Sequence, residues 1–223
     1  MEQIRRLHNS CKKDLINSNV RPGDTVLDCG CGRGGDWWKW KAVGARVFAI
    51  DPDAESLVEA EGRAREADFP VFFLGTGDIR HAAFAGPFDV VCYNFSLHYI
   101  LNSWEDSIKG IGCAVKPGGL LIGIVPDRNR ALAMADKYGE FSDRLENQFK
   151  IWRGGRQLLI GLADGPFYAD GPKDEPLLDP GTLIEALKGV GLELITWEPM
   201  IPKPNKLISD LYSKFVFKKV VNE

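Results

Sequence analysis

The fold is decided by residues 26–36, which read Val-Leu-Asp-Cys-Gly-Cys-Gly-Arg-Gly-Gly-Asp. The apolar run that begins at Thr25 and reaches Asp28 predicts a buried strand. Gly30, Gly32 and Gly35 follow it in the pattern G-x-G-x-x-G, directly before a predicted helix over residues 36–43. Glycines at such a junction allow the backbone to approach a bound nucleotide closely. The stretch therefore predicts a nucleotide-binding turn, with a tight structural turn as the alternative.

The pattern continues outward from this turn as an alternation of strands and helices. Strands are predicted at 46–50, 71–74, 88–93 and 120–125, and helices at 53–67 and 104–115. Asp53 is a suitable N-cap for the first of these helices, and the Pro117-Gly118-Gly119 sequence is expected to end the second one in a turn. Such alternation favours an α/β fold, a doubly wound and mostly parallel sheet with helices on both faces.

The second half of the chain has a different rhythm. Predicted there are a helix at 127–138, a hairpin of strands 148–152 and 156–162 around Gly154-Gly155, a loop at 164–180, a helix at 182–189, and closing strands at 192–197 and 214–220. We expect one domain over residues 1–223, with a leading helix in 1–22 and a substrate-side insertion at 147–180.

Composition sets broad limits on the kind of protein. The 223 residues are 44% hydrophobic and 26% charged, which argues against a disordered chain. No apolar run has a membrane span's length, and the amino terminus lacks a signal peptide's apolar segment. Five cysteines, without the spacing of a disulfide framework or a zinc site, favour reduced thiols. We expect an intracellular protein, in nucleus or cytoplasm, with no metal and no membrane partner.

Two carboxylates decide which cofactor the glycine turn suits. Asp51 lies 19 residues beyond Gly32, at the end of the next strand, where an acid can bind a ribose diol. Asp28, two residues before Gly30, would repel the pyrophosphate of a dinucleotide but would favour the cationic amine and sulfonium of S-adenosylmethionine. Asp78 follows the third strand near an adenine edge, or else caps a loop. The expected cofactor is therefore S-adenosylmethionine, with NAD as the weaker alternative.

The chain resembles the mRNA cap guanine-N7 methyltransferases, which have the Rossmann-like class I methyltransferase fold. The resemblance rests on residues 26–36 with Lys39-Trp40 after them, and on Phe95-Ser96-Leu97-His98-Tyr99, which matches the family's Phe-x-x-His-Tyr motif. Further similarities are His8-Asn9 with Lys12, Pro117-Gly118-Gly119, and the ending Leu211-Tyr212 with Phe215-Val216-Phe217-Lys218-Lys219. Ser10 departs from the family, which usually has an aromatic residue there, and the region between strands five and six is shorter than usual.

The resemblance implies two groups of site residues. The cofactor group is Lys12, Asp28, Gly30, Gly32, Asp51, Asp78 and Asn94. The cap group is Phe95, His98, Tyr99, Glu175 and Tyr212, of which Glu175 rests on the short match Lys173-Asp174-Glu175-Pro176-Leu177-Leu178. From the residues alone, His98 could be an ordinary structural histidine and Tyr212 an ordinary core residue. The six tryptophans are expected to pack rather than bind bases.

These residues fit a reaction that needs no general base. Guanine N7 carries an unshared electron pair, so methyl transfer requires in-line positioning, to which His98, Tyr99 and Glu175 would contribute. Glu175 can accept from the guanine N1–H and amine, and aromatic rings can stack on the base. The predicted function is methyl transfer from S-adenosylmethionine to N7 of the RNA cap guanine. The alternatives are a class I methyltransferase for another RNA or a small molecule, and a non-catalytic subunit that binds cofactor or cap.

Charge adds a prediction about the RNA. The formal net charge of −3 divides into +3 for residues 1–21, −9 for the middle, and +3 from residue 201 onward. We expect Lys12, Lys13, Lys203 and Lys206 to meet the triphosphate bridge of capped RNA, with solvated surface charge as the alternative. Because 223 residues leave little room beyond one domain, a separate RNA triphosphatase and guanylyltransferase are expected to make the cap.

Overall fold

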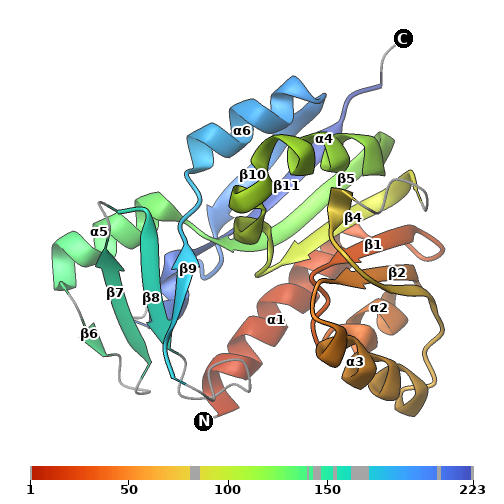
Figure 1. The fold of residues 1–223 in the computed structure, drawn as a ribbon, viewed down its shortest axis with the longest axis horizontal. Coiled ribbons are helices and arrows are strands. Elements are labelled where there is room, and N and C mark those ends of the chain that lie inside the picture. Colours follow the sequence, from red (N-terminus) through yellow and green to blue (C-terminus); the bar gives the residue numbers. More distant parts are fainter. Residues whose placement is uncertain are drawn as a thin grey trace.

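The computed structural model describes residues 2–80, 86–139, 141–142, 147–152, 155–161, 171–204 and 207–221. Its main feature is a seven-stranded sheet in the order β10-β11-β5-β4-β1-β2-β3 (Figure 1). Its strands are β1 (Thr25–Cys29), β2 (Arg46–Asp51), β3 (Val71–Thr76), β4 (Phe88–Asn94), β5 (Val115–Pro126), β10 (Leu192–Pro199) and β11 (Tyr212–Lys219). The strands β1 to β5 pair in parallel, whereas β11 is antiparallel to both β5 and β10. The predicted doubly wound, mostly parallel sheet is confirmed.

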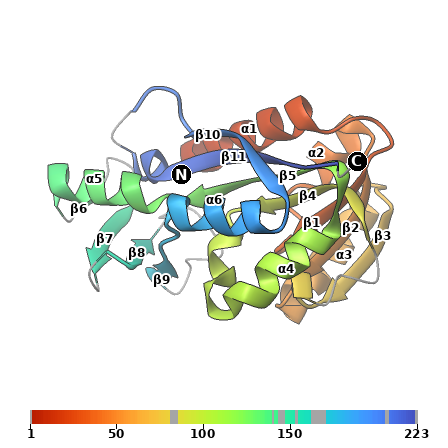
Figure 2. The same cartoon turned by 90° about the horizontal axis from the view of Figure 1, so that it is seen from above.

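Helices cover both faces of this sheet. The helices α1 (Glu2–Asn19), α2 (Trp37–Val43) and α3 (Ala54–Glu66) contribute Ile16, Trp37 and Ala60 to one buried cluster. The helices α4 (Trp104–Ala114) and α6 (Pro180–Gly189) contribute Ile111 and Leu183 to a second one. Figure 2 shows α1 and α2 on the opposite side of the sheet from α4 and α6. The two apolar layers hold the strand ends in a fixed relation, on which a site at those ends depends.

Local sequence explains where the helices begin and end. The Asp53 carboxylate accepts from the amides of Glu55 and Ser56, as a side-chain N-cap does. Asp127 caps α5 (Arg128–Tyr138) in the same way. Gly44 ends α2 in the left-handed conformation, with φ of 70°. The predicted cap at Asp53 is confirmed, as are the predicted end of one helix at residue 43 and the predicted start of another at about residue 127.

Tryptophan packing is confirmed for part of the predicted set. On α2, Trp37 and Trp40 are buried in the first cluster, whereas Trp38 is 65% exposed. In helical geometry these three neighbouring positions cannot all face the core.

Two predictions about secondary structure are wrong. Pro117-Gly118-Gly119 does not form a turn outside the sheet, because β5 already begins at Val115 and contains these residues. Its pairing with β4 shifts between Phe88 and Val90, so an irregularity in the ladder accommodates them. The predicted loop at 164–180 contains a strand, β9 (Lys173–Pro176). Residues 162–170 and Gly154 lie outside the described residues.

The strand β9 belongs to a second, smaller sheet of four antiparallel strands, in the order β6-β7-β8-β9. The others are β6 (Phe141–Ser142), β7 (Gln148–Trp152) and β8 (Gln157–Gly161), so the predicted hairpin is confirmed. Figure 1 shows this sheet beside one end of the main sheet. None of the helices in the described part of the chain is both long and apolar enough to cross a membrane.

Candidate active site

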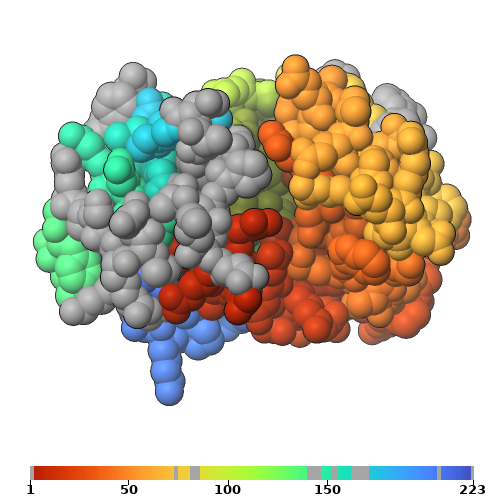
Figure 3. Space-filling view, turned by 90° about the horizontal axis from the view of Figure 1, so that it is seen from below, coloured from red at the N-terminus to blue at the C-terminus, as the bar shows by residue number. Residues whose placement is uncertain are grey.

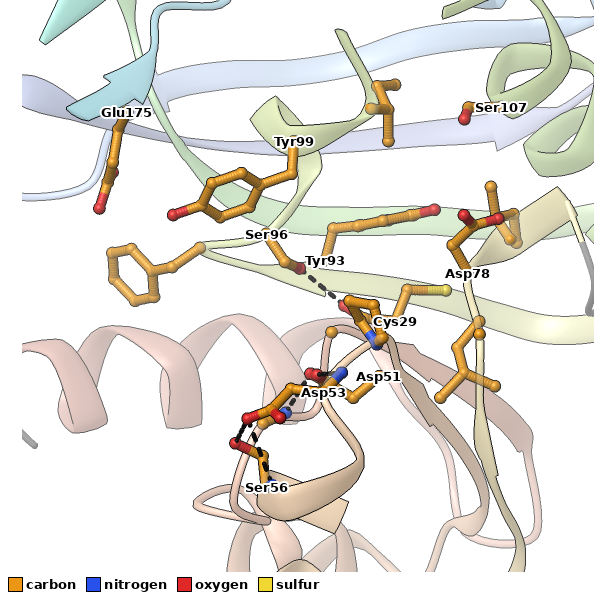
Figure 4. Close-up of a pocket in the computed structure, with 18 of the residues that line it drawn as sticks. Cys29, Asp51, Asp53, Ser56, Asp78, Tyr93, Ser96, Tyr99, Ser107 and Glu175 are labelled. Carbon is orange, nitrogen blue, oxygen red and sulfur yellow. Dashed lines mark hydrogen bonds between the residues drawn. The ribbon is translucent and has the colours of Figure 1, made fainter. Parts of the chain in front are cut away.

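A cavity of about 700 Å³ lies where β1, β2 and β4 end. One part of its wall consists of Cys29, Gly30, Gly32, Asp51, Gly77 and Asp78. Another part consists of Arg5, His8, Phe95, Tyr99, Glu175 and Tyr212. Figure 3 shows a hollow between the amino-terminal helix, in red, and the segment that follows β2, in orange. In Figure 4, Glu175 and Tyr99 lie together at one end, well away from Asp51 and Asp53.

The glycine turn is built for close approach. Gly30 has φ of 73°, and a Cβ atom there would lie 2.5 Å from the Cβ of Ser96. Ser96 in turn donates a 2.6 Å hydrogen bond from Oγ to the carbonyl of Cys29. Any larger residue than glycine at position 30 would thus collide with the segment after β4 as well as strain the backbone.

Asp51 is the acid of the cavity wall nearest to this turn. Its carboxylate accepts from the amide of Gly32 at 2.7 Å and from the amide of Asp53 at 2.9 Å. These bonds fix the side chain at the carboxyl end of β2, as the sequence predicted. Asp78 also lines the cavity, but its carboxylate accepts from the Nε of Arg80 at 2.9 Å.

Asp28 lies behind the turn rather than on the cavity wall. It is only 2% exposed, and its Oδ2 accepts a 2.9 Å hydrogen bond from the Nε1 of Trp40. Burial, with the nearby charge of Asp36, raises the pKa of Asp28 to about 7. Asp28 is absent from the cavity lining, so a ligand in the cavity would not contact it directly.

Lys12 and Asn94 meet at Asp36 instead of on the cavity wall. The Asp36 carboxylate pairs with Lys12 at 2.8 Å and with Lys39 at 2.7 Å, and it accepts from the Nδ2 of Asn94 at 3.1 Å. Burial opposes ionisation of Asp36, but the two lysines outweigh it and lower its pKa to about 2. The Oδ1 of Asn94 is buried and has no hydrogen-bond partner.

Aromatic rings and a buried acid make up the other end of the cavity. The rings of Phe95 and Tyr212 meet edge to face, with centroids 5.1 Å apart. Glu175, on β9, is 4% exposed, and its Oε2 lies 3.3 Å from the Nε2 of His98. His98 is itself behind the wall, since it is 1% exposed and does not line the cavity. Four of the five predicted cap residues therefore reach the cavity, and the fifth, His98, lies behind its wall next to Glu175, with no hydrogen bond to a described residue at either ring nitrogen.

Two tyrosines of this end remain protonated at neutral pH. Burial, followed by the charge of Glu175, raises the pKa of Tyr99. The same two causes raise the pKa of Tyr212. Both phenols can therefore donate hydrogen bonds.

Phe95 has an unusual backbone conformation. Its φ is 65°, in a region that costs a non-glycine residue about 1–3 kcal/mol. Such strain persists only where neighbouring contacts hold it, and it turns the ring toward the cavity that Phe95 lines.

Sequence reasoning missed Arg5 and His8 as cavity residues. They lie three residues apart on α1, which places them on one face of the helix, and both line the cavity. The ring of His8 stacks on Phe95 with centroids 4.9 Å apart. Ser10, by contrast, is exposed. The signal available in the sequence was the helical spacing from Arg5 through His8 to Lys12.

The glycine-turn end fits S-adenosylmethionine. Gly32 has open space where a Cβ would be, so the turn presents backbone to the cavity. Asp51 offers a fixed acceptor at the end of the second strand, the position from which an acid binds a ribose diol in nucleotide-binding folds of this kind. Among the described residues, no three His, Cys, Asp or Glu side chains gather as a metal ion would need.

Comparison with known proteins identifies the class first. A family model described as "Methyltransferase domain" matches residues 26–119. A solved S-adenosylmethionine-dependent methyltransferase from Clostridium acetobutylicum matches 99% of this chain and 96% of its own, with TM-score 0.68 and 16% identity. A Burkholderia thailandensis 1,6-didemethyltoxoflavin-N1-methyltransferase, solved with bound S-adenosylhomocysteine, matches 96% and 79%, with TM-score 0.62 and 18% identity. The chain has the class I methyltransferase fold, and the predicted fold class is confirmed.

Curated relatives then show which methyltransferases the chain resembles in sequence. The mRNA cap guanine-N(7) methyltransferase of Eremothecium gossypii is 33% identical over 161 residues, which are 65% of this chain and 36% of that protein. The protein of that name from Cryptococcus neoformans is 27% identical over 242 residues, which are 99% of this chain and 36% of that protein. The predicted resemblance to this family is confirmed, and the matches support S-adenosylmethionine as the cofactor. The chain spans about a third of the length of the curated relatives it matches.

Proposed function

We propose that this chain transfers a methyl group from S-adenosylmethionine to N7 of the guanine that caps an RNA. The observation that supports this most strongly is that one cavity joins a glycine turn with Asp51 to an end that holds Glu175 and three aromatic residues. A nucleoside-containing cofactor fits the first end, and a purine base fits the second. The curated relatives with this name favour the same substrate.

The cofactor end holds its ligand through backbone and one carboxylate. Asp51 is already fixed by two amides, and its position suits the ribose diol. Asp28 and Asp36 lie behind the turn, and ionised Asp36 would act on a cationic ligand through its charge rather than by contact. Asp28, with a pKa of about 7, would add to this effect in its ionised form. When bound, S-adenosylmethionine supplies a methyl group on a sulfonium, which is a good leaving group.

The base end selects and orients guanine. Glu175 can accept from the N1–H and the exocyclic amine, two donors that adenine does not present together on that edge. Because Glu175 is buried, a base without these two donors would lose both hydrogen bonds in a site with little water to replace them, and this gives discrimination. The rings of Phe95, Tyr99 and Tyr212 supply flat contacts that strengthen as the base becomes cationic. His98 is buried behind the cavity wall, with its Nε2 3.3 Å from the Oε2 of Glu175.

These residues accelerate the reaction by positioning. Guanine N7 needs no deprotonation, so the chain has to hold N7 in line with the methyl group at about 3–3.5 Å. Such orientation is worth about 7–11 kcal/mol in favourable systems. Tyr99 and Tyr212 stay protonated and uncharged, so they do not compete for the methyl group as phenolates.

Two proposals concern the partner. Arg5 lines the cavity at the base end and is exposed, so it can contact the phosphates that follow the cap guanosine. The four lysines that the sequence suggested for the phosphates are placed differently. Lys13 and Lys203 are exposed but do not line the cavity, and Lys12 is paired with Asp36. Lys206 lies outside the described residues. The cap itself would come from a separate RNA triphosphatase and guanylyltransferase, and the reaction would take place inside the cell.

The proposal is tested by incubating the purified chain with labelled S-adenosylmethionine and matched RNAs that end in GpppA, in a triphosphate or in a hydroxyl. We expect label on the GpppA end alone, released as 7-methylguanosine by nuclease digestion. Label at an internal nucleotide would point to a different RNA methyltransferase. Binding of S-adenosylhomocysteine without methylation of any of the three RNAs would favour a non-catalytic subunit.

A further inference from the structure

The side chain of His8 links the amino-terminal helix to the segment that leads into β11. It lies on α1, and its Nε2 shares a 2.8 Å hydrogen bond with the Oγ of Ser209. Ser209 belongs to the buried 3-10 helix η4 (Ile208–Leu211), which directly precedes Tyr212. The orientation of the His8 ring is thus determined by a buried partner, 201 residues away in sequence.

The fixed ring of His8 contacts two of the three aromatic residues at the cavity's base end, Phe95 and Tyr212. It stacks on Phe95 at 4.9 Å with planes 23° apart, and it meets Tyr212 edge to face at 5.8 Å. Phe95 and Tyr212 also touch each other. The three rings form a closed trio, in which each ring contacts the other two.

Phe95 is the member of the trio that needs such support. Its positive φ is a conformation that a residue with a Cβ leaves unless neighbours hold it. On the backbone side, its amide donates to the carbonyl of Ile124 at 2.8 Å. On the side-chain side, the flat support of its ring comes from His8, with Lys12 Nζ farther off at 5.9 Å from the ring centroid.

The stack is one between uncharged rings at neutral pH. Burial, with Lys12 nearby, lowers the pKa of His8 to about 4. A neutral imidazole can accept the Ser209 hydroxyl proton in a hydrogen bond, and it places no positive charge beside a base that becomes cationic on methylation.

We propose that His8 is a positioning residue, which holds Phe95 and Tyr212 in the geometry that receives the substrate base. This inference rests on the proposed function, since it assigns the trio to base binding. His8 acts through the two rings and leaves the cofactor end unchanged, because the Asp51 contacts involve neither α1 nor η4. An aromatic ring at position 8 can replace the stack, whereas a methyl group cannot.

The test compares His8→Ala, His8→Phe and Ser209→Ala with the unmodified chain. The matched control is Ser10→Ala, an exposed residue on the same helix. Each protein is assayed for kcat and KM with GpppA-capped RNA, for the Kd of S-adenosylhomocysteine by calorimetry, and for Tm. We expect His8→Ala to raise KM for the capped RNA by about threefold to tenfold, the range of one aromatic pair. The Kd of S-adenosylhomocysteine should change by less than about twofold. His8→Phe should have a KM close to that of the unmodified chain.

The outcomes separate this inference from the proposed function. If the unmodified chain methylates capped RNA and His8→Ala has the same KM as Ser10→Ala, the positioning role is wrong and the function stands. If His8→Ala lowers Tm and weakens S-adenosylhomocysteine binding as much as RNA binding, His8 has a general structural role, which also overturns the inference. If the unmodified chain does not methylate capped RNA at all, the proposed function fails and the assignment of the trio to base binding fails with it.

Discussion

Replacing Asp28 with asparagine is predicted to stabilise the fold as the pH rises. The substitution is nearly isosteric, and the amide oxygen can still accept from Trp40. Burial and the neighbouring Asp36 raise the pKa of Asp28 from 3.8 to about 7, so the folded protein disfavours the carboxylate. The stability that this group contributes is complete below pH 3.8, the unfolded value, and is lost as the pH rises through 7. Asparagine carries no such cost at any pH.

The size of the effect follows from the shift. One pKa unit corresponds to about 1.4 kcal/mol, so a change from 3.8 to about 7 amounts to roughly 4 kcal/mol when Asp28 is fully ionised. By the same relation, about 3 kcal/mol of this total develops between about pH 4.5 and pH 8. Urea unfolding of both proteins at these two pH values measures the change in their difference. The exposed Asp136→Asn serves as control.

The expected result is a free-energy difference that moves in favour of Asp28→Asn by about 3 kcal/mol between about pH 4.5 and pH 8. The Asp136 control should not show this change, and equal m-values in all proteins would confirm that the comparison is valid. If the difference between Asp28→Asn and the unmodified chain did not vary with pH, then Asp28 would be an ordinary ionised aspartate. Burial would then not raise the pKa of Asp28.

Three further predictions concern the two ends of the cavity. Asp51→Asn should weaken S-adenosylhomocysteine binding by roughly tenfold to hundredfold, as loss of charge-assisted bonds does, and calorimetry showing a Kd within twofold would contradict the ribose assignment. Gly30→Ala should lower the free energy of unfolding by about 2–4 kcal/mol, because it adds both backbone strain and a collision with Ser96. Gly32→Ala is the control, since it adds backbone strain alone. Equal losses of stability in urea unfolding would show that the collision is unimportant. Glu175→Gln should reduce kcat/KM for GpppA-capped RNA by about tenfold to hundredfold with cofactor binding unchanged, and full activity would remove Glu175 from base recognition.

The main fold could be predicted because its signals are local. Periodicity and punctuation identified the strands of the parallel sheet, and Asp53 and Asp127 marked helix starts that the structure confirms. The strand β9 could not be found in this way. Its sequence Lys-Asp-Glu-Pro has no apolar alternation, and it is a strand because it pairs with β8, where Glu175 lies opposite Leu158.

The site residues likewise fall into two groups, those that local spacing can place and those that depend on tertiary contacts. The positions of Gly30 and Asp51 follow from their distance along a strand-turn-helix unit, so sequence reasoning could place them. The burial of Asp28 under Trp40 depends on how α2 packs against the sheet. The stacking of His8 on Phe95 depends on contact between α1 and the segment after β4, which is 87 residues away. Such contacts are tertiary, and no local pattern specifies them.

In the proposed reaction, N7 of a cap guanine receives the methyl group. It is tested most directly by comparing GpppA-capped RNA with an RNA in which the cap guanine carries carbon in place of N7. We expect methylation of the first RNA, with 7-methylguanosine as the product, and none of the 7-deaza RNA, although both present the same edge to Glu175. Equal methylation of the two RNAs, or a methyl group on any atom other than N7, would contradict it.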